Sequence, residues 1–189
     1  MNPKIRQAFE DSAAVKLSFV DRYHADIATV AAVIIEAFRH DRKLLLFGNG
    51  GSATDASHLA AEFVNRFTAD RRALPALALA TDMSVVTSIS NDLDYSQLFA
   101  RQIEAFGRPG DIAIAISTSG NSPNVIKGAD VARRLDLVTI GFTGGSGGQL
   151  ASRVAHAFIV PSSVTARIQE THITLGHVLC ELVEEAFRA

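Results

Sequence analysis

The sequence predicts an α/β protein whose five-stranded parallel sheet is flanked by helices on both faces, with a pair of helices before the first strand. Five short apolar runs alternate with segments of helical periodicity, which implies right-handed βαβ units. Clusters of glycine and serine follow two of these runs, at strand ends where such sheets bind ligands. A chain of 189 residues suits one domain, with helices over 1–40 and the α/β core and C-terminal helix over 43–189.

The first 40 residues contain no glycine, and their only proline is Pro3. Their apolar residues recur at helical spacing, which predicts two helices separated by a break near Asp21–His24. We expect the apolar faces of these helices to pack between subunits. The alternative is that they pack on their own domain.

Five apolar runs have the length and the boundaries of strands that are buried on both faces. They are Lys43–Phe47, Leu74–Leu79, Asp111–Ile116, Leu137–Phe142 and Ala157–Val160. The segments between them that predict helices are Ser52–Phe67, Met83–Ser90, Ser96–Phe106, Pro123–Arg134 and Gly148–Ala151. A last helix is expected from Thr165 to Arg188.

Composition excludes several classes of protein. The 18 basic and 20 acidic side chains give a net charge of −2, which provides no electrostatic footprint for nucleic acid or an anionic membrane but leaves room for a local phosphate pocket. Cys180 is the single cysteine, so an intrachain disulfide and a cysteine-based zinc site are both excluded. No apolar run approaches the ~20 residues of a membrane span. The N-terminal residues do not form a secretory signal, so we expect a cytoplasmic protein.

A first glycine-rich loop follows the first predicted strand and opens a helix. It consists of Gly48, Asn49, Gly50, Gly51 and Ser52. Glycines let the backbone approach a ligand closely, and the free N–H groups of a helix start suit an anion or sugar oxygens. The loop matches neither a dinucleotide fingerprint nor a P-loop, and a plain strand-to-helix turn remains the alternative.

A second loop follows the DIAIAI run and is rich in hydroxyl groups. Ser117, Thr118, Ser119 and Ser122 lie within six residues, and Pro123 suits the first position of the next helix. Hydroxyls and backbone N–H groups together surround a phosphate without any lysine. The alternative is that Ser122 caps the helix, but capping needs one hydroxyl rather than four.

Four polar side chains lie at helical spacing on two distant helices. His58 and Glu62 are four residues apart, and Gln169 and His177 are eight apart, so each pair shares a helix face. Two imidazoles, a carboxylate and an amide oxygen suit Zn²⁺ or a neighbouring divalent metal, and Glu62 and His177 equally suit a general base and acid. A surface salt bridge explains the His58–Glu62 spacing as well, and spacing cannot show that the two helices meet.

Four blocks of the sequence carry a resemblance to a known family. They are GNGGSATDASHLAAEFVNRF (48–67), ATDMSVVTSISND (80–92), ISTSGNSPNV (116–125) and ARIQETHITLGHVLCELVE (166–184). In order and spacing they resemble the bacterial phosphoheptose isomerases of the sugar isomerase (SIS) domain superfamily. The resemblance covers essentially the whole chain.

The resemblance implies an activity and an assembly. The activity is the isomerisation of sedoheptulose 7-phosphate to D-glycero-D-manno-heptose 7-phosphate, a step toward lipopolysaccharide or other surface heptose. The assembly is a homotetramer with active sites at subunit interfaces. The sugar phosphate is the small-molecule partner, and no nucleic acid or membrane is implied.

The resemblance also assigns roles to individual residues. It implies one Zn²⁺ per subunit, held by His58, Glu62, Gln169 and His177. It implies Glu62 as the catalytic base and His177 as the catalytic acid. The residues it implies at the substrate are Asn49, Gly50, Gly51, Ser52, Glu62, Asn91, Asp92, Ser117, Thr118, Ser119, Ser122 and Gln169.

Two other functions stay open at this point. One is another sugar-phosphate isomerase of the same superfamily, acting on an arabinose or hexulose phosphate. The other is a non-catalytic phosphosugar-binding module, or a scaffold like the replication-initiator-associating relatives, whose pattern lacks the glutamate and the histidine. This chain keeps both, as Glu62 and His177, which favours an enzyme.

Overall fold

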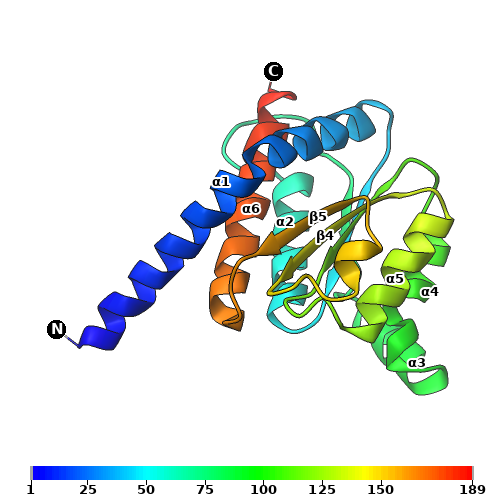
Figure 1. Cartoon of the computed structure of the whole chain (residues 1–189). Coiled ribbons are helices and arrows are strands. Elements are labelled where there is room, and N and C mark those ends of the chain that lie inside the picture. Colours follow the sequence, from blue (N-terminus) through cyan, green and yellow to red (C-terminus); the bar gives the residue numbers. More distant parts are fainter. Residues whose placement is uncertain (1, 189) are drawn as a thin grey trace.

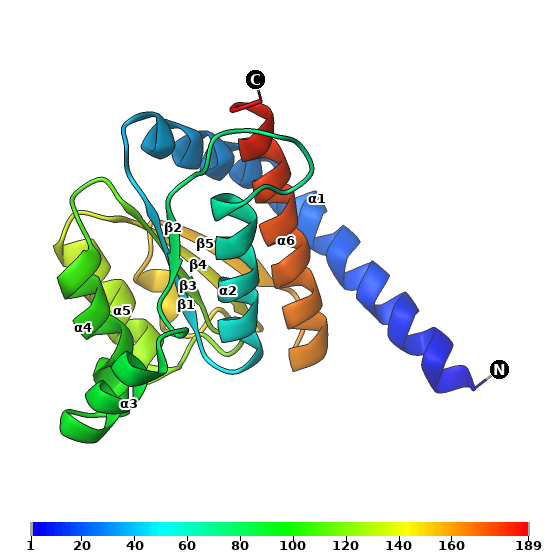
Figure 2. The same cartoon turned by 180° about the vertical axis from the view of Figure 1, so that it is seen from behind.

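The computed structural model describes residues 2–188 and has an α/β architecture with one sheet between two layers of helices (Figures 1 and 2). The five strands are all parallel in the order β2-β1-β3-β4-β5. Their bounds are β1 Leu44–Gly48, β2 Ala76–Ala78, β3 Ile112–Ile116, β4 Val138–Gly144 and β5 His156–Val160. The helices are α1 Pro3–Arg39, α2 Gly51–Val64, α3 Met83–Asp92, α4 Leu98–Phe106, α5 Pro123–Arg134 and α6 Thr165–Glu185, with short 3₁₀ turns at Tyr95–Gln97 and Leu150–Ser152.

Alternation along the strands divides the core between the two faces of the sheet. On one face, Leu44 and Leu46 pack with residues of α1, α2 and α6. On the other face, Leu45 and Phe47 pack with residues of α4 and α5. Every residue of β1 and β3 is buried, which confirms the predicted sheet with helices on both faces.

The predicted N-terminal helical pair is wrong, because α1 is one helix from Pro3 to Arg39. Its ribbon changes direction part way along without ending (Figures 1 and 2). The polar residues near Asp21–His24 lie on its exposed side, while Tyr23 and Ile27 continue the buried stripe from Phe19. The hydroxyl of Tyr23 also accepts a hydrogen bond from the N–H of Ile159, which ties this turn to β5. Packing and the lack of a helix breaker therefore keep the helix continuous.

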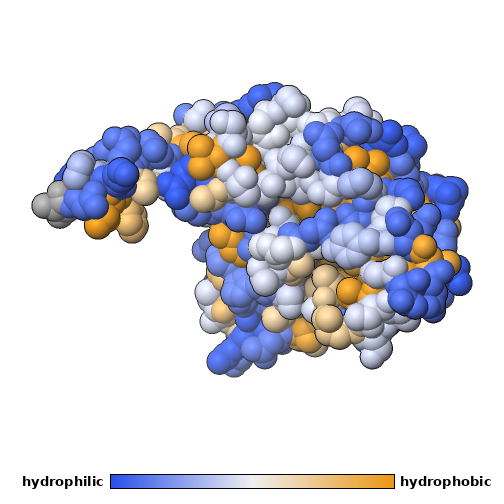
Figure 3. All heavy atoms as spheres, turned by 90° about the horizontal axis from the view of Figure 1, so that it is seen from below, coloured by the Kyte–Doolittle hydropathy of each residue, from blue (hydrophilic) through white to orange (hydrophobic). Residues whose placement is uncertain are grey.

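The two halves of α1 have different surroundings. The second half packs on its own sheet, whereas Phe9 and Leu17 in the first half are 76% and 65% exposed. Figure 3 shows this half as an arm that leaves the body of the molecule, with apolar side chains gathered on it. The expectation that residues 1–40 pack between subunits is therefore wrong for the second half and stays a prediction for the arm.

Other boundaries differ from the prediction by one turn or less. The segment Gly148–Ala151 contributes only the 3₁₀ turn, because Gly147 and Gly148 adopt positive φ angles that a helix does not. The last helix ends at Glu185, and α3 extends through Asp92. Within residues 2–188, no helix has the length and apolar character needed to cross a bilayer.

The connections after β1 and β3 leave the sheet on opposite faces. The first leads to α2, on the face of α1 and α6, and the second leads to α5, on the face of α4. Since β1 and β3 are neighbours, a crevice opens between their carboxyl ends, which is where ligands bind in sheets of this kind. The first loop and the hydroxyl-rich loop lie at this point.

Candidate active site

Two asparagines join the loops across the crevice. Asn49 and Asn124 exchange side-chain amide hydrogen bonds, Nδ2 to Oδ1, both at 2.8 Å. Asn124 is buried in the first turn of α5, and the hydroxyl of Tyr95 also donates to Oδ1 of Asn49 at 2.9 Å. The pairing fixes the amide plane of Asn49, which the resemblance places at the substrate. Sequence reasoning missed Asn124 and Tyr95.

The first loop turns as the glycines predict. Gly50 has φ +56° at the start of α2, and no side chain caps the N–H groups there. Gly51 lies against α6, and a Cβ atom there would lie 2.4 Å from Nε2 of Gln169 and would displace that side chain. Ser52 is buried under the loop against Gly48, so its side chain supports the turn from below.

The hydroxyl-rich loop places a serine at the N-cap of α5 that does not cap the helix. Ser122 occupies the N-cap position, but its Oγ lies 3.0 Å from Oγ of Ser117 instead of bonding the helix. Pro123 is at the first position of α5, as predicted. Ser117 is buried, Thr118 is half-buried and Ser119 is exposed. Oδ1 of Asn124 accepts from the N–H of Val125 at 3.0 Å, so the N–H of Asn124, beside the hydroxyls, is the donor that this helix start offers to an anion.

The loop that follows β4 packs against the hydroxyl-rich loop. Gly120 has φ +66°, and a Cβ atom there would lie 2.1 Å from the carbonyl oxygen of Gly147. The N–H of Leu150 donates to the carbonyl of Gly120 at 2.9 Å. A polar cavity of about 240 Å³ lies beside these loops, and its hydroxyl groups come from Thr118, Ser119, Ser146, Ser162, Ser163 and Thr165.

The histidines and the glutamate of the sequence analysis meet between α2 and α6. The helices run in the same direction, because Gly51 faces Gln169 and His58 faces His177. Nε2 of His58 lies 2.9 Å from Nε2 of His177 and 3.4 Å from Oε1 of Glu62. Phe67 stacks on His177 with ring centroids 5.4 Å apart. The structure thus brings His177 to the pair of His58 and Glu62, which sequence spacing could not do.

Charge and burial set the protonation states in this cluster. Burial lowers the pKa of His177, His58 lowers it further and Glu62 raises it, so a neutral imidazole is favoured at neutral pH. Asp55 lies one turn before His58, and burial raises its pKa while His58 opposes the shift. Its buried Oδ2 has no hydrogen-bond partner within residues 2–188. Sequence reasoning gave no signal for Asp55.

The donor types suit zinc, but their arrangement does not close around one ion. Tetrahedral zinc with ~2.0–2.1 Å bonds holds its ligand atoms about 3.3 Å apart, which the His58–Glu62 distance matches and the His58–His177 distance does not reach. Gln169 packs against Gly51, which is about two helical turns from His58. Within residues 2–188, no three His, Cys, Asp or Glu side chains are arranged to hold a metal ion.

The remaining expected substrate residues lie apart from the loops. Asn91 and Asp92 are exposed on the last turn of α3, where Nδ2 of Asn91 donates to Oδ1 of Asp92 at 2.8 Å. No hydrogen bond within residues 2–188 joins them to the first loop or to the hydroxyl-rich loop. Their part in the site stays a prediction.

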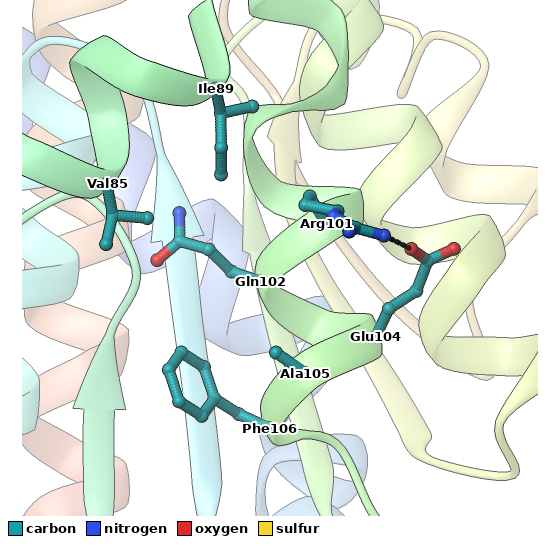
Figure 4. Close-up of a pocket in the computed structure, with 7 residues that line it drawn as sticks. All are labelled: Val85, Ile89, Arg101, Gln102, Glu104, Ala105 and Phe106. Carbon is teal, nitrogen blue, oxygen red and sulfur yellow. Dashed lines mark ion pairs between the residues drawn. The ribbon is translucent and has the colours of Figure 1, made fainter. Parts of the chain in front are cut away.

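The largest cavity described lies away from these residues. It has about 370 Å³ and is lined by Val85, Ile89, Arg101, Gln102, Glu104, Ala105 and Phe106 (Figure 4). The amide of Gln102 is already bonded to the carbonyls of Leu79 and Leu98, and Arg101 pairs with Glu104. This cavity therefore offers an apolar surface without free catalytic groups.

Comparison with known proteins gives a consistent family. The profile of the SIS domain matches residues 8–144. The phosphoheptose isomerase of Thermodesulfovibrio yellowstonii is 57% identical, over 96% of this chain and 90% of its own length. That of Aquifex aeolicus is 55% identical, over 98% and 97%. The structure of phosphoheptose isomerase from Neisseria gonorrhoeae superposes with a TM-score of 0.91 at 36% identity, covering 97% of this chain and 98% of that one.

Proposed function

The chain belongs to the SIS domain family and, within it, to the phosphoheptose isomerases, which are aldose–ketose isomerases; from this premise we propose that its substrate is sedoheptulose 7-phosphate. The product is D-glycero-D-manno-heptose 7-phosphate, formed through an enediol. The observation that carries the proposal is the meeting of His58, Glu62 and His177 in one cluster. These are the groups that proton transfer between two carbons and two oxygens requires.

The hydroxyl-rich loop holds the phosphate in this proposal. Thr118, Ser119 and the N–H of Asn124 at the start of α5 provide donors, and the close contact between Gly120 and Gly147 keeps the loop in place. Binding the remote phosphate orients C1 and C2 of the sugar, which converts binding energy into rate. Oδ1 of Asn49 already accepts two hydrogen bonds, so its amide offers the second N–H of Nδ2 as a fixed donor to the sugar hydroxyls.

Proton transfer falls to Glu62 and His177. Glu62 removes a proton from C1 of the ketose while the neutral imidazole of His177 donates its ring N–H proton to O2, which gives the enediol. His177 then recovers a proton from O1, and the carboxyl of Glu62 returns its proton to C2. The net change moves the carbonyl from C2 to C1 and leaves both side chains as they began. Such acid–base transfers typically contribute ~10²–10⁴ in rate.

We also propose one Zn²⁺ per subunit, held by His58, Glu62, Gln169 and His177. The donor types support it, although the side chains must shift before they enclose an ion. When bound, the ion supplies Lewis-acid stabilisation of negative charge on the sugar oxygens. Metal analysis of the purified protein tests the proposal directly. About one zinc per subunit that is lost in a His58→Ala variant supports it, and a metal content that is unchanged in that variant contradicts it.

A homotetramer with active sites at subunit interfaces is part of the proposal. The support is that the His58–His177 cluster faces outward, with the side chain of His58 half exposed, and that the hydroxyl-rich cavity is lined by neither histidine. A second copy that covers α2 and α6 brings the missing donors to each site. The exposed apolar arm of α1 provides surface for such an assembly. We place the reaction in the cytoplasm, where it feeds lipopolysaccharide or other surface heptose.

A substrate panel tests this function. We expect turnover of sedoheptulose 7-phosphate at least ~100-fold above that of arabinose 5-phosphate or a hexulose 6-phosphate, since donors fixed to a longer sugar reject shorter ones. A matched preparation of Glu62→Gln controls for contaminating isomerases. Higher turnover of a shorter sugar phosphate contradicts the proposed substrate. Binding of the sugar phosphates without any turnover contradicts the enzyme.

A further inference from the structure

A buried carboxylate on the last turn of α6 takes no part in the proton transfers proposed above. Glu184 is 1% exposed and accepts hydrogen bonds from three successive residues of the segment after α2. The N–H of Phe67 donates to Oε2 at 2.8 Å. The N–H groups of Thr68 and Ala69 and the hydroxyl of Thr68 donate to Oε1 at 2.7–2.8 Å. Oε1 thus accepts three hydrogen bonds and Oε2 accepts one.

These bonds make Glu184 a permanent anion. Burial alone raises the pKa of its carboxyl group, but the bonds from Thr68, Phe67 and Ala69 outweigh burial and hold the pKa to about 2. The group is therefore charged wherever the protein is folded and active. The hydrogen bonds that it accepts from Phe67, Thr68 and Ala69 therefore persist throughout the physiological pH range.

Glu184 is connected to His177 through Phe67. Glu184 and His177 are seven residues apart on α6, which places both side chains on one face of the helix. Phe67 spans them, because its backbone N–H is bound by Glu184 and its ring stacks on the imidazole of His177 at an angle of 30°. The hydrogen bond from the Phe67 N–H to Glu184 therefore fixes the position of the Phe67 ring against the imidazole of His177.

Glu184 is connected to the backbone of Glu62 through Arg71. The side chain of Arg71 is 1% exposed, and its Nε lies 3.7 Å from Oε2 of Glu184. Nη2 of Arg71 donates to the carbonyl of Glu62 at 2.8 Å, and Nη1 donates to the carbonyl of Asn65 at 3.3 Å. Arg71 thereby holds the last turn of α2, which carries Glu62. Glu184 supplies the countercharge that lets this guanidinium stay buried.

We propose that Glu184 is a positioning residue for the isomerase reaction: it fixes Phe67 against His177 and, through Arg71, fixes the turn of α2 that carries Glu62. This inference rests on the proposed function, because it assigns the effect of Glu184 to these two side chains. Glu184 touches neither substrate nor reacting atoms, so it acts only through its partners. Small displacements of catalytic groups lower kcat strongly while they leave ground-state binding nearly intact.

Turnover of matched variants tests the inference first. In Glu184→Gln, an amide NH₂ faces the N–H donors and Arg71 loses its countercharge, so we expect kcat to fall ~30-fold while KM stays within ~2-fold. Phe67→Leu removes the stacking ring, and we expect kcat to fall ~10-fold. The controls are Glu185→Gln, which is exposed beside Glu184, and Phe106→Leu in the distant cavity. Both controls should keep the wild-type kcat and KM.

The double variant separates positioning from general destabilisation. If Glu184 acts largely through Phe67, adding Phe67→Leu to Glu184→Gln should lower kcat by no more than about 2-fold further. If kcat of the double variant falls by the product of the two single-variant losses, the inference is contradicted. A folded Glu184→Gln protein with kcat within ~2-fold of wild type also contradicts it. Should Glu184→Gln fail to fold, Thr68→Val removes one of the four bonds, and we expect kcat to fall ~3-fold with unchanged KM; an unchanged kcat contradicts the inference.

A spectroscopic measurement decides the inference without substrate. The ring current of Phe67 displaces the Cε1–H resonance of His177, so Phe67→Leu should shift that resonance at fixed pH. We expect Glu184→Gln to shift it in the same direction and Glu185→Gln to leave it in place. A His177 resonance that Phe67→Leu moves and Glu184→Gln does not would overturn the positioning role. If wild-type protein fails to convert sedoheptulose 7-phosphate, the proposed function fails, while this resonance still tests the geometry.

Discussion

The carboxyl edge of the sheet and the face between α2 and α6 are built in different ways. At the sheet edge, backbone N–H groups, hydroxyls and a closed Asn49–Asn124 pair form a fixed surface, with Gly120 wedged against Gly147. Between α2 and α6, ionisable side chains meet instead, and His58 is half exposed. The first surface suits the recognition of an anion and the second suits the movement of protons.

The difference teaches that binding and chemistry can be changed separately in this fold. Substitutions at the sheet edge should act mainly on substrate affinity, and substitutions on α2 or α6 should act mainly on turnover. A substitution at the sheet edge that lowers turnover, or one on α2 or α6 that weakens substrate binding, would show that the two regions are coupled in the working assembly.

The largest effect is expected from Glu62→Gln. The amide keeps the size of the side chain but cannot accept a proton from carbon, so kcat should fall ~10³-fold. Affinity for inorganic phosphate, measured by calorimetry, should stay within ~2-fold of wild type. A kcat near that of wild type in a folded preparation removes Glu62 from its role, and a parallel loss of phosphate affinity contradicts the division between the regions.

A second effect concerns stability rather than activity. His172 on α6 is buried with its Nε2 3.0 Å from the carbonyl of Thr143, and burial lowers its pKa to about 4. The unfolded chain therefore binds a proton more readily than the folded one, so the stability contributed by neutral His172 is complete above about pH 6.5 and is lost as the pH falls through 4. The loss should reach about 3 kcal/mol in the free energy of unfolding.

Denaturant unfolding at several pH values measures this loss. His172→Gln keeps a donor for the carbonyl of Thr143 but does not titrate, so its stability should fall less steeply between pH 6.5 and 4. His156→Gln on β5 is the matched control, because it replaces a half-buried histidine elsewhere, in the sheet. Parallel curves for wild type and His172→Gln would show that the buried imidazole does not set the acid sensitivity.

At the sheet edge, Ser119→Ala should weaken anion binding. A hydrogen bond to a charged group contributes about 1.5 kcal/mol or more, which corresponds to a rise of ~10-fold in the dissociation constants of phosphate and of sugar phosphate alike. Ser152→Ala, on the 3₁₀ turn outside the cavity, is the control. Unchanged phosphate affinity in Ser119→Ala and in the other serine variants of the loop would count against the phosphate site.

The smallest effect is expected from Asn124→Ala. The substitution removes two of the three hydrogen bonds that hold the amide of Asn49, and kcat/KM for the sugar phosphate should fall ~5- to 10-fold while inorganic phosphate binds as before. Phosphate titration beside steady-state kinetics makes the comparison. A loss of phosphate affinity equal to the loss in kcat/KM would show that the pair supports the phosphate loop instead of the sugar.

The sheet edge was open to sequence analysis because topology alone gathers its parts. Parallel strands bring their carboxyl ends to one side, so the loops after Phe47 and Ile116 must lie together. The buried Asn124 lies in the segment ISTSGNSPNV, but the sequence did not indicate its role because its partner, Asn49, is on the first loop. The break predicted near Asp21–His24 is wrong because Tyr23, which stands among polar residues in the sequence, buries its ring and continues the apolar stripe of α1.

The α2–α6 face was less predictable because it depends on how two distant helices pack. Spacing placed His58 with Glu62 but could not bring them to His177, and it could not show that Gln169 packs on Gly51. Glu184 left one signal: it is a carboxylate four residues after the buried Cys180, on the apolar stripe of α6. Three of its four donors are backbone N–H groups, which no side-chain pattern reveals.

An NMR time course of the purified protein with sedoheptulose 7-phosphate in D₂O tests the central claim most directly. Proton transfer through the carboxylate of Glu62 predicts that heptose 7-phosphate appears with deuterium at C2, and that Glu62→Gln forms neither product nor deuterated substrate. A folded wild-type protein that binds the sugar phosphate but forms no heptose 7-phosphate would contradict the claim. So would product that carries no solvent deuterium together with full activity in Glu62→Gln.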